Sequence, residues 1–274
     1  MNPLHLRWRG LILAALLCLT YRPFAVASDE PTLTKEQIKQ FLLTAKVVHH
    51  QATKKGITHT LRLTLSDGTV THDASFQPID VHKPLAELPT GSELNFVDSY
   101  KYNIAAYALA ELLGMDDMLP VYVERKWDGN VGSLSWWLPV KMDEGEHLKQ
   151  KLEPPDVDAW NHQMYKIHVF DQLVSDSDPN LTNVLISANW KIWRIDFTRA
   201  FRLNDQLKDP RKTLLRCDRQ LLEKLKVLDG NALTEKTKNY LTKNEVKAVM
   251  ARRDKIVAYF QKLIAEKGED EVLY

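Results

Sequence analysis

The chain contains the stretch Asp171-Gln-Leu-Val-Ser-Asp-Ser-Asp178-Pro-Asn-Leu-Thr-Asn183, followed shortly by Trp193-Arg-Ile-Asp196. An Asn thus stands five residues after Asp178, and a second Asp follows a short apolar strand. Phosphoryl transfer needs such a set, because one carboxylate accepts a hydroxyl proton while an Asn and another carboxylate hold Mg²⁺ against phosphate oxygens. The pattern therefore predicts that these residues together form one functional site.

The same acidic loop has two simpler interpretations. A loop rich in Asp, Ser and Asn can be turn chemistry alone, since these side chains bind their own backbone. Asp176, Asp178 and Asn180 also have the spacing of the first three ligands of an EF-hand. An EF-hand needs Gly and Glu further on, where this chain has Leu181 and Ser187, so the calcium-loop interpretation is excluded.

The segments before this loop are mostly β-structured by pattern. Thr34 begins a capping box for a helix to about Val47, and residues 58–76 alternate around a Ser-Asp-Gly turn, as a hairpin does. A Pro-containing loop follows. The remaining expected elements are a helix over 98–113 and strands over 119–124 and 131–139.

The segments around and after the loop are mostly helical by pattern. The expected elements are helices at 157–174, 218–228, 234–241 and 243–267, with short strands at 184–186 and 193–195. A β-rich first lobe over 28–140 and a helical second lobe over 141–274 follow from this order. The sequence thus predicts an α+β protein with two lobes.

The amino terminus has the pattern of an export signal. Arg7 and Arg9 precede the apolar run 11–19, and Ala25-Val-Ala27 matches a small-residue cleavage site. We therefore expect residues 1–27 to be a removable signal peptide and the protein to be exported, periplasmic or secreted. An uncleaved anchor is the alternative, although the apolar run is short for a membrane span.

Composition adds little about partners. The 37 basic and 36 acidic residues nearly balance, so no overall charge attracts nucleic acid. After signal cleavage no membrane span is expected, and Cys217 is the one remaining cysteine, so an internal disulfide is excluded. The expected partners follow from the phosphoryl-transfer pattern described above and not from composition, and they are a nucleotide and an unknown protein or small-molecule acceptor.

The amino-acid sequence of the acidic region resembles that of a known group of kinases. The segments from Asp171 to Asn183 and from Arg194 to Phe201 are similar to the atypical protein-kinase-like fold of phosphatidylinositol 3-/4-kinases, HipA-type kinases and secreted Fam20-like kinases. The resemblance implies a two-lobed protein-kinase-like fold. It also implies roles for the three polar residues, with Asp178 as catalytic base and Asn183 and Asp196 as ligands of Mg²⁺ or Mn²⁺ with ATP.

The same resemblance assigns cofactor-binding positions in the first lobe. Gly56 would lie in the turn over the phosphates, and Gln77 occupies the place where the family has Lys. The helix position that would pair with this Lys holds Asn103 instead of Glu, so both halves of the ion pair are replaced together. A hinge at about 134–140 would contact the purine. It includes Trp136 and Trp137, of which only one can line the cleft because adjacent strand residues face opposite sides.

Two functions remain open at this point. The first is an exported kinase-fold phosphotransferase that depends on a metal. The alternative is a catalytically impaired, pseudokinase-like binding or scaffold protein of the periplasm, which the absent Lys and Glu favour. A metal-dependent hydrolase that reuses the acidic loop is a weaker third possibility, since no nucleophile motif accompanies it.

Overall fold

The computed structural model describes residues 33–53, 60–88, 91–178 and 180–274. The predicted signal peptide and Gly56 therefore lie outside the described residues. Leu33–Tyr274 form one unit. Within the described ranges no helix is long and apolar enough to cross a membrane.

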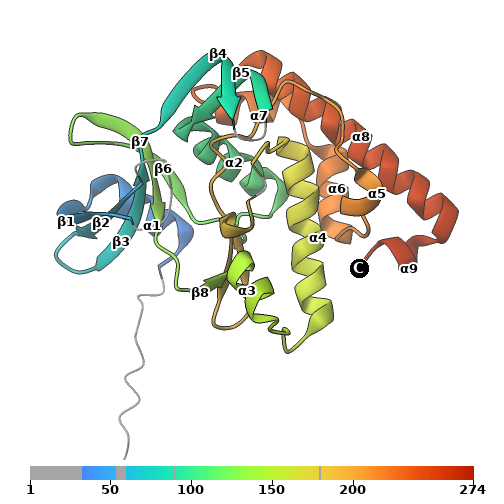
Figure 1. The fold of residues 1–274 in the computed structure, drawn as a ribbon, viewed down its shortest axis with the longest axis horizontal. Helices are drawn as coiled ribbons and strands as arrows, with labels where there is room; N and C mark the ends of the chain where they lie inside the picture. Colours follow the sequence, from blue (N-terminus) through green and yellow to red (C-terminus); the bar gives the residue numbers. More distant parts are fainter. Residues whose placement is uncertain (1–32, 54–59, 89–90, 179) are drawn as a thin grey trace, which may run out of the picture. The chain divides into compact units, whose positions relative to one another are not determined.

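A five-stranded antiparallel sheet forms the first part of this unit (Figure 1). Its strands lie in the order β1-β2-β3-β7-β6. Their bounds are β1 Lys46–Ala52, β2 Leu61–Ser66, β3 Thr71–Gln77, β7 Asn130–Trp136 and β6 Tyr122–Trp127. The hairpin of β2 and β3 is the one that the alternating pattern predicts. The expectation of helix up to Val47 is wrong, because Lys46 already pairs with Ser66 at the start of β1.

The two faces of this sheet differ in polarity because neighbouring side chains of a strand alternate. One face carries buried apolar residues such as Leu63, Leu65 and Phe76. Helix α1 (Lys35–Thr44) packs on it, with the Phe41 ring edge-on to Trp136 at 5.8 Å. The predicted capping box at Thr34 begins this helix. The opposite face carries Gln77 and is polar, and we call it the polar face of the sheet.

Helix α2 (Tyr100–Leu113) is almost entirely buried and begins two residues later than the sequence indicates. Ser99 caps it by accepting a hydrogen bond from the Lys101 N–H, and Gly114 ends it in the left-handed conformation. Asp98 belongs to a strand instead, where it pairs with Val81. This shift turns Asp98 from a helix residue into a residue at the end of a hairpin.

The expected Pro-containing loop is a second hairpin, β4 (Asp80–Leu88) with β5 (Gly91–Ser99), so that prediction is wrong. The pattern predicted a loop because Pro84 lies in this segment and proline disfavours strands. Among the residues that the structure describes, this sheet has two strands, so each strand has a free edge on which a residue without an N–H is tolerated. The hairpin leads directly into α2.

The rest of the chain is mainly helical and surrounds a small sheet of β8 (Val140–Asp143), β9 (Val184–Ser187) and β10 (Ile192–Arg194). The helices are α3 Glu144–Gln150, α4 Val157–Val174, α5 Pro210–Thr213, α6 Arg219–Val227, α7 Gly230–Thr237, α8 Lys243–Lys267 and α9 Glu269–Val272. The periodicity predicts α4 and α8 to the residue. Strand β8 and helix α3 were not expected. The mixture of a sheet-rich first part and a helical second part confirms the predicted fold class.

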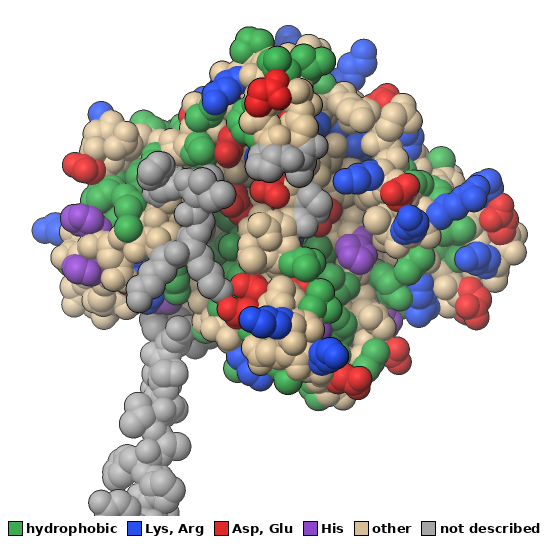
Figure 2. All heavy atoms as spheres, viewed as in Figure 1, with side chains coloured by type: hydrophobic (Ala, Val, Ile, Leu, Met, Phe, Trp, Pro, Cys, Tyr) green, Lys and Arg blue, Asp and Glu red, His purple; other side chains and the backbone are tan. Residues whose placement is uncertain are grey.

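Acidic and basic side chains are interspersed over the face of the molecule drawn in Figure 2. This mixture agrees with the nearly balanced charge of the chain. The thiol of Cys217 is buried beside the last residues of the chain, and burial raises its pKa to about 12. The position of this thiol favours a structural role.

Gly132 in β7 permits the close approach of β7 to the end of β3. A methyl group at this position would lie 2.6 Å from the Gln77 carbonyl oxygen and 2.8 Å from Pro78 Cα. Both are backbone atoms, so the strands would have to separate. We expect Gly132→Ala to lower the free energy of unfolding by about 1–3 kcal/mol, measured by urea denaturation.

Gly230→Ala is the matched control for this substitution. The nearest atom to a methyl group there is Met250 Cγ at 3.5 Å, which is an ordinary contact. A similar loss of stability in both variants would contradict the proposed role of the close approach.

Candidate active site

The acidic loop begins where α4 ends. Ser175 ends the helix in the left-handed conformation, with φ of 50°. The side chain of Asp176 then accepts a hydrogen bond of 2.9 Å from the Asp178 N–H. Asn180 in turn caps the short 3-10 helix η1 (Leu181–Asn183) by accepting from the Thr182 N–H. Local turn chemistry thus shapes the loop.

Asp196 follows β10 and is held from two sides. Its backbone is left-handed, with φ of 59°. The Thr198 hydroxyl donates to Asp196 Oδ1 at 3.0 Å, and the Gln77 amide lies 3.5 Å from the same oxygen. Burial raises the pKa of the Asp196 carboxyl; the Thr198 hydrogen bond opposes this rise and the Asp98 carboxylate adds to it.

Backbone pairing brings Asn183 next to Asp196. The Ile195 N–H donates to the Asn183 carbonyl at 3.0 Å, one residue before Asp196. The end of η1 and the end of β10 are therefore neighbours. The structure thus places two of the predicted metal ligands on adjoining segments.

Asp98 is an acidic residue of this region that the sequence did not indicate. Burial raises the pKa of its carboxyl; Thr198 and Arg199 oppose the rise, and the charge of Asp178 adds to it. Asp98 also raises the pKa of Asp196. One of its oxygens, Oδ1, is buried and has no hydrogen-bond partner among the described residues. Asp98 is therefore within electrostatic reach of both Asp178 and Asp196.

Gln77 and Asn103 meet directly, as their joint replacement suggested. The Asn103 amide donates to Gln77 Oε1 at 2.8 Å and to the Ser133 hydroxyl at 3.1 Å. Its oxygen accepts from the Phe197 N–H at 2.7 Å. A neutral amide pair thus links β3, α2 and the segment after Asp196.

A buried cation lies behind the acidic loop. Arg194 forms ion pairs with Asp176 and, at 3.1 Å, with Asp171. The side chains of Arg194 and Asp176 are each 1% exposed. Burial raises the pKa of Asp171 to about 6, although Arg194 opposes the rise. Asp176 also accepts a hydrogen bond from the Asp178 N–H. This cluster therefore positions the backbone of the candidate base, Asp178.

The two tryptophans face opposite sides of the sheet. The Trp136 ring stacks on His72 at 3.5 Å and packs against Phe41, on the side covered by α1. Trp137 lies beside Arg62, whose guanidinium carbon is 4.4 Å from the ring centroid. Arg62 shares the polar face with Gln77. Of the two tryptophans in the predicted hinge, only Trp137 is on the face of the sheet that carries Gln77, the partner of Asp196.

The donor atoms suit a hard cation that arrives with phosphate. Among the residues that the structure describes, no group of three or more His, Cys, Asp and Glu side chains could hold a metal ion alone. Mg²⁺ commonly takes one or two carboxylates and completes its shell with water and phosphate oxygens. Asn183 and Asp196 offer oxygens of the required kind, so they fit an ion of this type.

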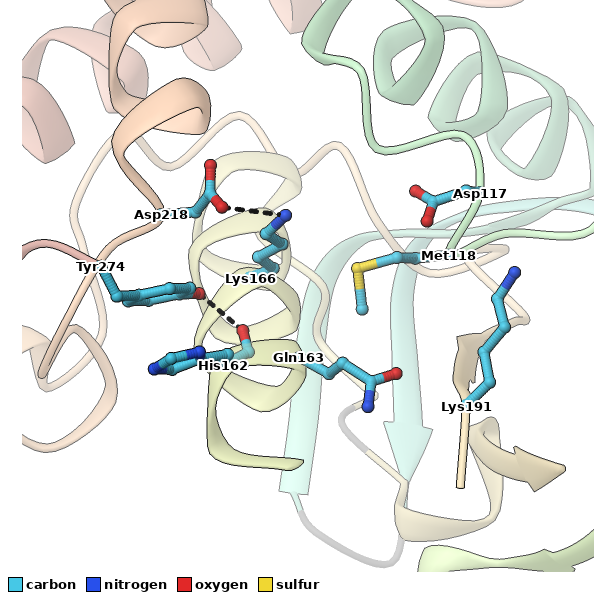
Figure 3. A pocket seen from close by; sticks show the side chains of 8 residues that line it. All are labelled: Asp117, Met118, His162, Gln163, Lys166, Lys191, Asp218 and Tyr274. Carbon is cyan, nitrogen blue, oxygen red and sulfur yellow. Dashed lines mark hydrogen bonds and ion pairs between the residues drawn. The ribbon is translucent and has the colours of Figure 1, made fainter. Parts of the chain in front are cut away.

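A separate pocket of about 440 Å³ lies beside α4, Lys191 and the C-terminal residue (Figure 3). In this pocket Lys166 pairs with Asp218 at 3.0 Å, and the Tyr274 hydroxyl donates to the His162 carbonyl at 2.5 Å. Of the predicted site residues that the structure describes, none lines it. The pocket is therefore distinct from the candidate active site.

A sheet-rich part, a helical part and this arrangement of acidic loops define the class, an atypical protein-kinase-like fold. Solved kinase structures share it. A Fam20 protein from hydra, solved with sugar, has a TM-score of 0.60 at 15% identity, over 87% of this chain and 91% of its own. A Golgi casein kinase has a TM-score of 0.63 at 15% identity, over 87% of this chain and 77% of its own.

A third structure is less similar. The Helicobacter pylori proinflammatory kinase CtkA has a TM-score of 0.47 at 9% identity, over 80% of this chain and 94% of its own. Neither a family model nor a curated protein matches the chain. At 15% identity the likeness to the hydra and Golgi structures shows the fold alone, and it confirms the predicted kinase-like fold.

Proposed function

We propose that this protein is an exported, metal-dependent phosphotransferase. Asp178 would accept the proton of the acceptor hydroxyl, and Asn183 and Asp196 would hold Mg²⁺ or Mn²⁺ with the phosphates of ATP. The observation that carries the proposal is the convergence of the acidic loop and Asp196, joined by the hydrogen bond from Ile195 to Asn183. The structural similarity to a Golgi casein kinase supports it.

In this proposal, neighbouring side chains orient the candidate base and one candidate metal ligand. The Asp176 carboxylate orients Asp178 through its backbone N–H. Thr198 and Gln77 orient the Asp196 carboxylate. A bound divalent ion supplies the positive charge that the phosphates need. Burial, with the charge of Asp98 in addition, raises the pKa of Asp196 and makes its ionised form costly, which agrees with a carboxylate placed to receive a cation.

The test is the thermal midpoint of the purified protein with ATP or GTP and Mg²⁺ or Mn²⁺. At a ligand concentration of about 100 times Kd, binding contributes about 2.7 kcal/mol. This corresponds to a rise of roughly 5–10 °C for a domain of this size. Asp196→Asn should remove the rise. Unchanged midpoints with every metal and nucleotide would refute the proposal.

The second candidate is a catalytically impaired binding or scaffold protein. The neutral pair of Gln77 and Asn103 favours it, because the usual Lys neutralises phosphate charge and this chain has an amide there. It predicts that Asp196→Ala leaves function intact. A phosphorylated product made by the wild-type protein and lost in Asp178→Ala would exclude this candidate.

A further inference from the structure

In the segment after β7, both backbone groups of Trp137 and the N–H of Val140 already have hydrogen-bond partners within the chain. We call residues 137–140 the hinge segment. The Trp137 N–H donates to the Asp73 carbonyl at 3.1 Å, and the Trp137 carbonyl is bound by the His72 ring at 3.0 Å. The Val140 N–H donates to the Leu138 carbonyl at 3.0 Å, and Pro139 has no N–H.

The polar face that carries Gln77 also carries an ion pair, whereas a purine base needs an apolar or aromatic surface. Arg62 Nε donates to Asp73 at 2.7 Å, and the Thr64 hydroxyl donates to the same carboxylate at 2.6 Å. Burial alone would raise the pKa of Asp73, but the hydrogen bonds from Thr64 and Arg62 hold it below its ordinary value. The pair therefore stays charged at neutral pH.

Strand register places this ion pair in line with Gln77. Arg62 is opposite Ser75, which is opposite Ser135 on β7. Ser75 is two positions before Gln77 on β3. It and its two cross-strand partners are all polar. Arg62 also covers one face of the Trp137 ring. A planar base stacks on apolar or aromatic surface, and here the aromatic surface already has a partner.

We propose that the phosphoryl donor is recognised through its metal-bound phosphates and not through its base. The ligand class is then a nucleoside triphosphate of any base, or inorganic triphosphate. This inference rests on the proposed function, because it assigns phosphate and metal to Asn183 and Asp196. It differs from the purine contact that the kinase resemblance implies at the hinge.

The experiment compares ATP, GTP, CTP, UTP and inorganic triphosphate, each titrated into the full protein with Mn²⁺ by calorimetry. The expected result is that all five dissociation constants agree within about threefold, a spread below 1 kcal/mol. A preference of about tenfold or more for the purines would overturn this inference and leave the proposed function standing. Failure of all five to bind would refute the proposed function itself.

Removing the ion pair tests its role directly. Arg62→Ala combined with Asp73→Ala uncovers the Trp137 ring without leaving a lone charge. This variant should bind ATP more tightly relative to inorganic triphosphate, by about fivefold or more. The matched control removes an exposed pair of the helical part, Arg219→Ala with Glu269→Ala, and should leave the ratio unchanged. An unchanged ratio in the Arg62 and Asp73 variant would count against the inference.

Discussion

Arg194→Leu is expected to lower the free energy of unfolding by about 3–5 kcal/mol. The side chains of Arg194 and Asp176 are each 1% exposed, and they form an ion pair. Removing the guanidinium leaves the Asp176 carboxylate buried without its counter-charge, which costs more than the loss of a neutral hydrogen bond. Chemical denaturation followed by circular dichroism measures the change.

Two further variants separate this effect from a general loss of packing. Arg194→Leu combined with Asp176→Leu removes the fully buried lone carboxylate but still leaves Asp171 without its partner, so part of the stability should return. Lys262→Gln breaks an exposed pair with Glu266, at 3.7 Å, and should cost less than about 0.5 kcal/mol. If Arg194→Leu were no more harmful than Lys262→Gln, the buried pair would not matter to stability.

Asp178→Asn is expected to slow phosphoryl transfer by about 10²–10⁴-fold, because an amide cannot accept the acceptor's proton. The substitution keeps the size of the side chain. It also keeps the backbone N–H that Asp176 holds, so the loop should retain its conformation. Release of phosphate from ATP with Mn²⁺, with water as acceptor, gives the rate without knowledge of the natural acceptor.

Binding measured on the same variant distinguishes chemistry from folding. The thermal shift with ATP and Mn²⁺ should persist in Asp178→Asn and disappear in Asp196→Asn. A variant Asp178→Asn that retains more than about a tenth of the wild-type rate would show that this carboxylate is not the base.

The sequence was most informative where a residue's role depends on near neighbours. The spacing of Asp178, Asn183 and Asp196 is local, and so is the capping that begins and ends α4. Helix α8 was predicted at about 243–267, in agreement with its observed bounds Lys243–Lys267, because helical periodicity is a property of one continuous segment. The same locality explains why the residues of the acidic loop suffice to show its resemblance to kinases.

Residues whose role depends on partners distant in the sequence were not predicted from the local pattern. Asp98 looked like the start of a helix, and only its pairing with Val81 places it beside Thr198 and near Asp178. The hairpin of β4 and β5 was missed because Pro84 is acceptable only where a strand edge is free. Its acceptability is decided by the neighbouring chain and not by the local pattern.

By itself the sequence determined the order of the main elements, the acidic loop and the presence of two amides, Gln77 and Asn103, at positions where the resemblance implies an ion pair. Tertiary structure alone decided that these two amides bind each other, that Arg194 is buried against Asp176, and that Arg62 covers Trp137. The physical reason is range. Backbone propensity and capping act over a few residues, whereas burial and charge pairing depend on which distant segments the fold brings together.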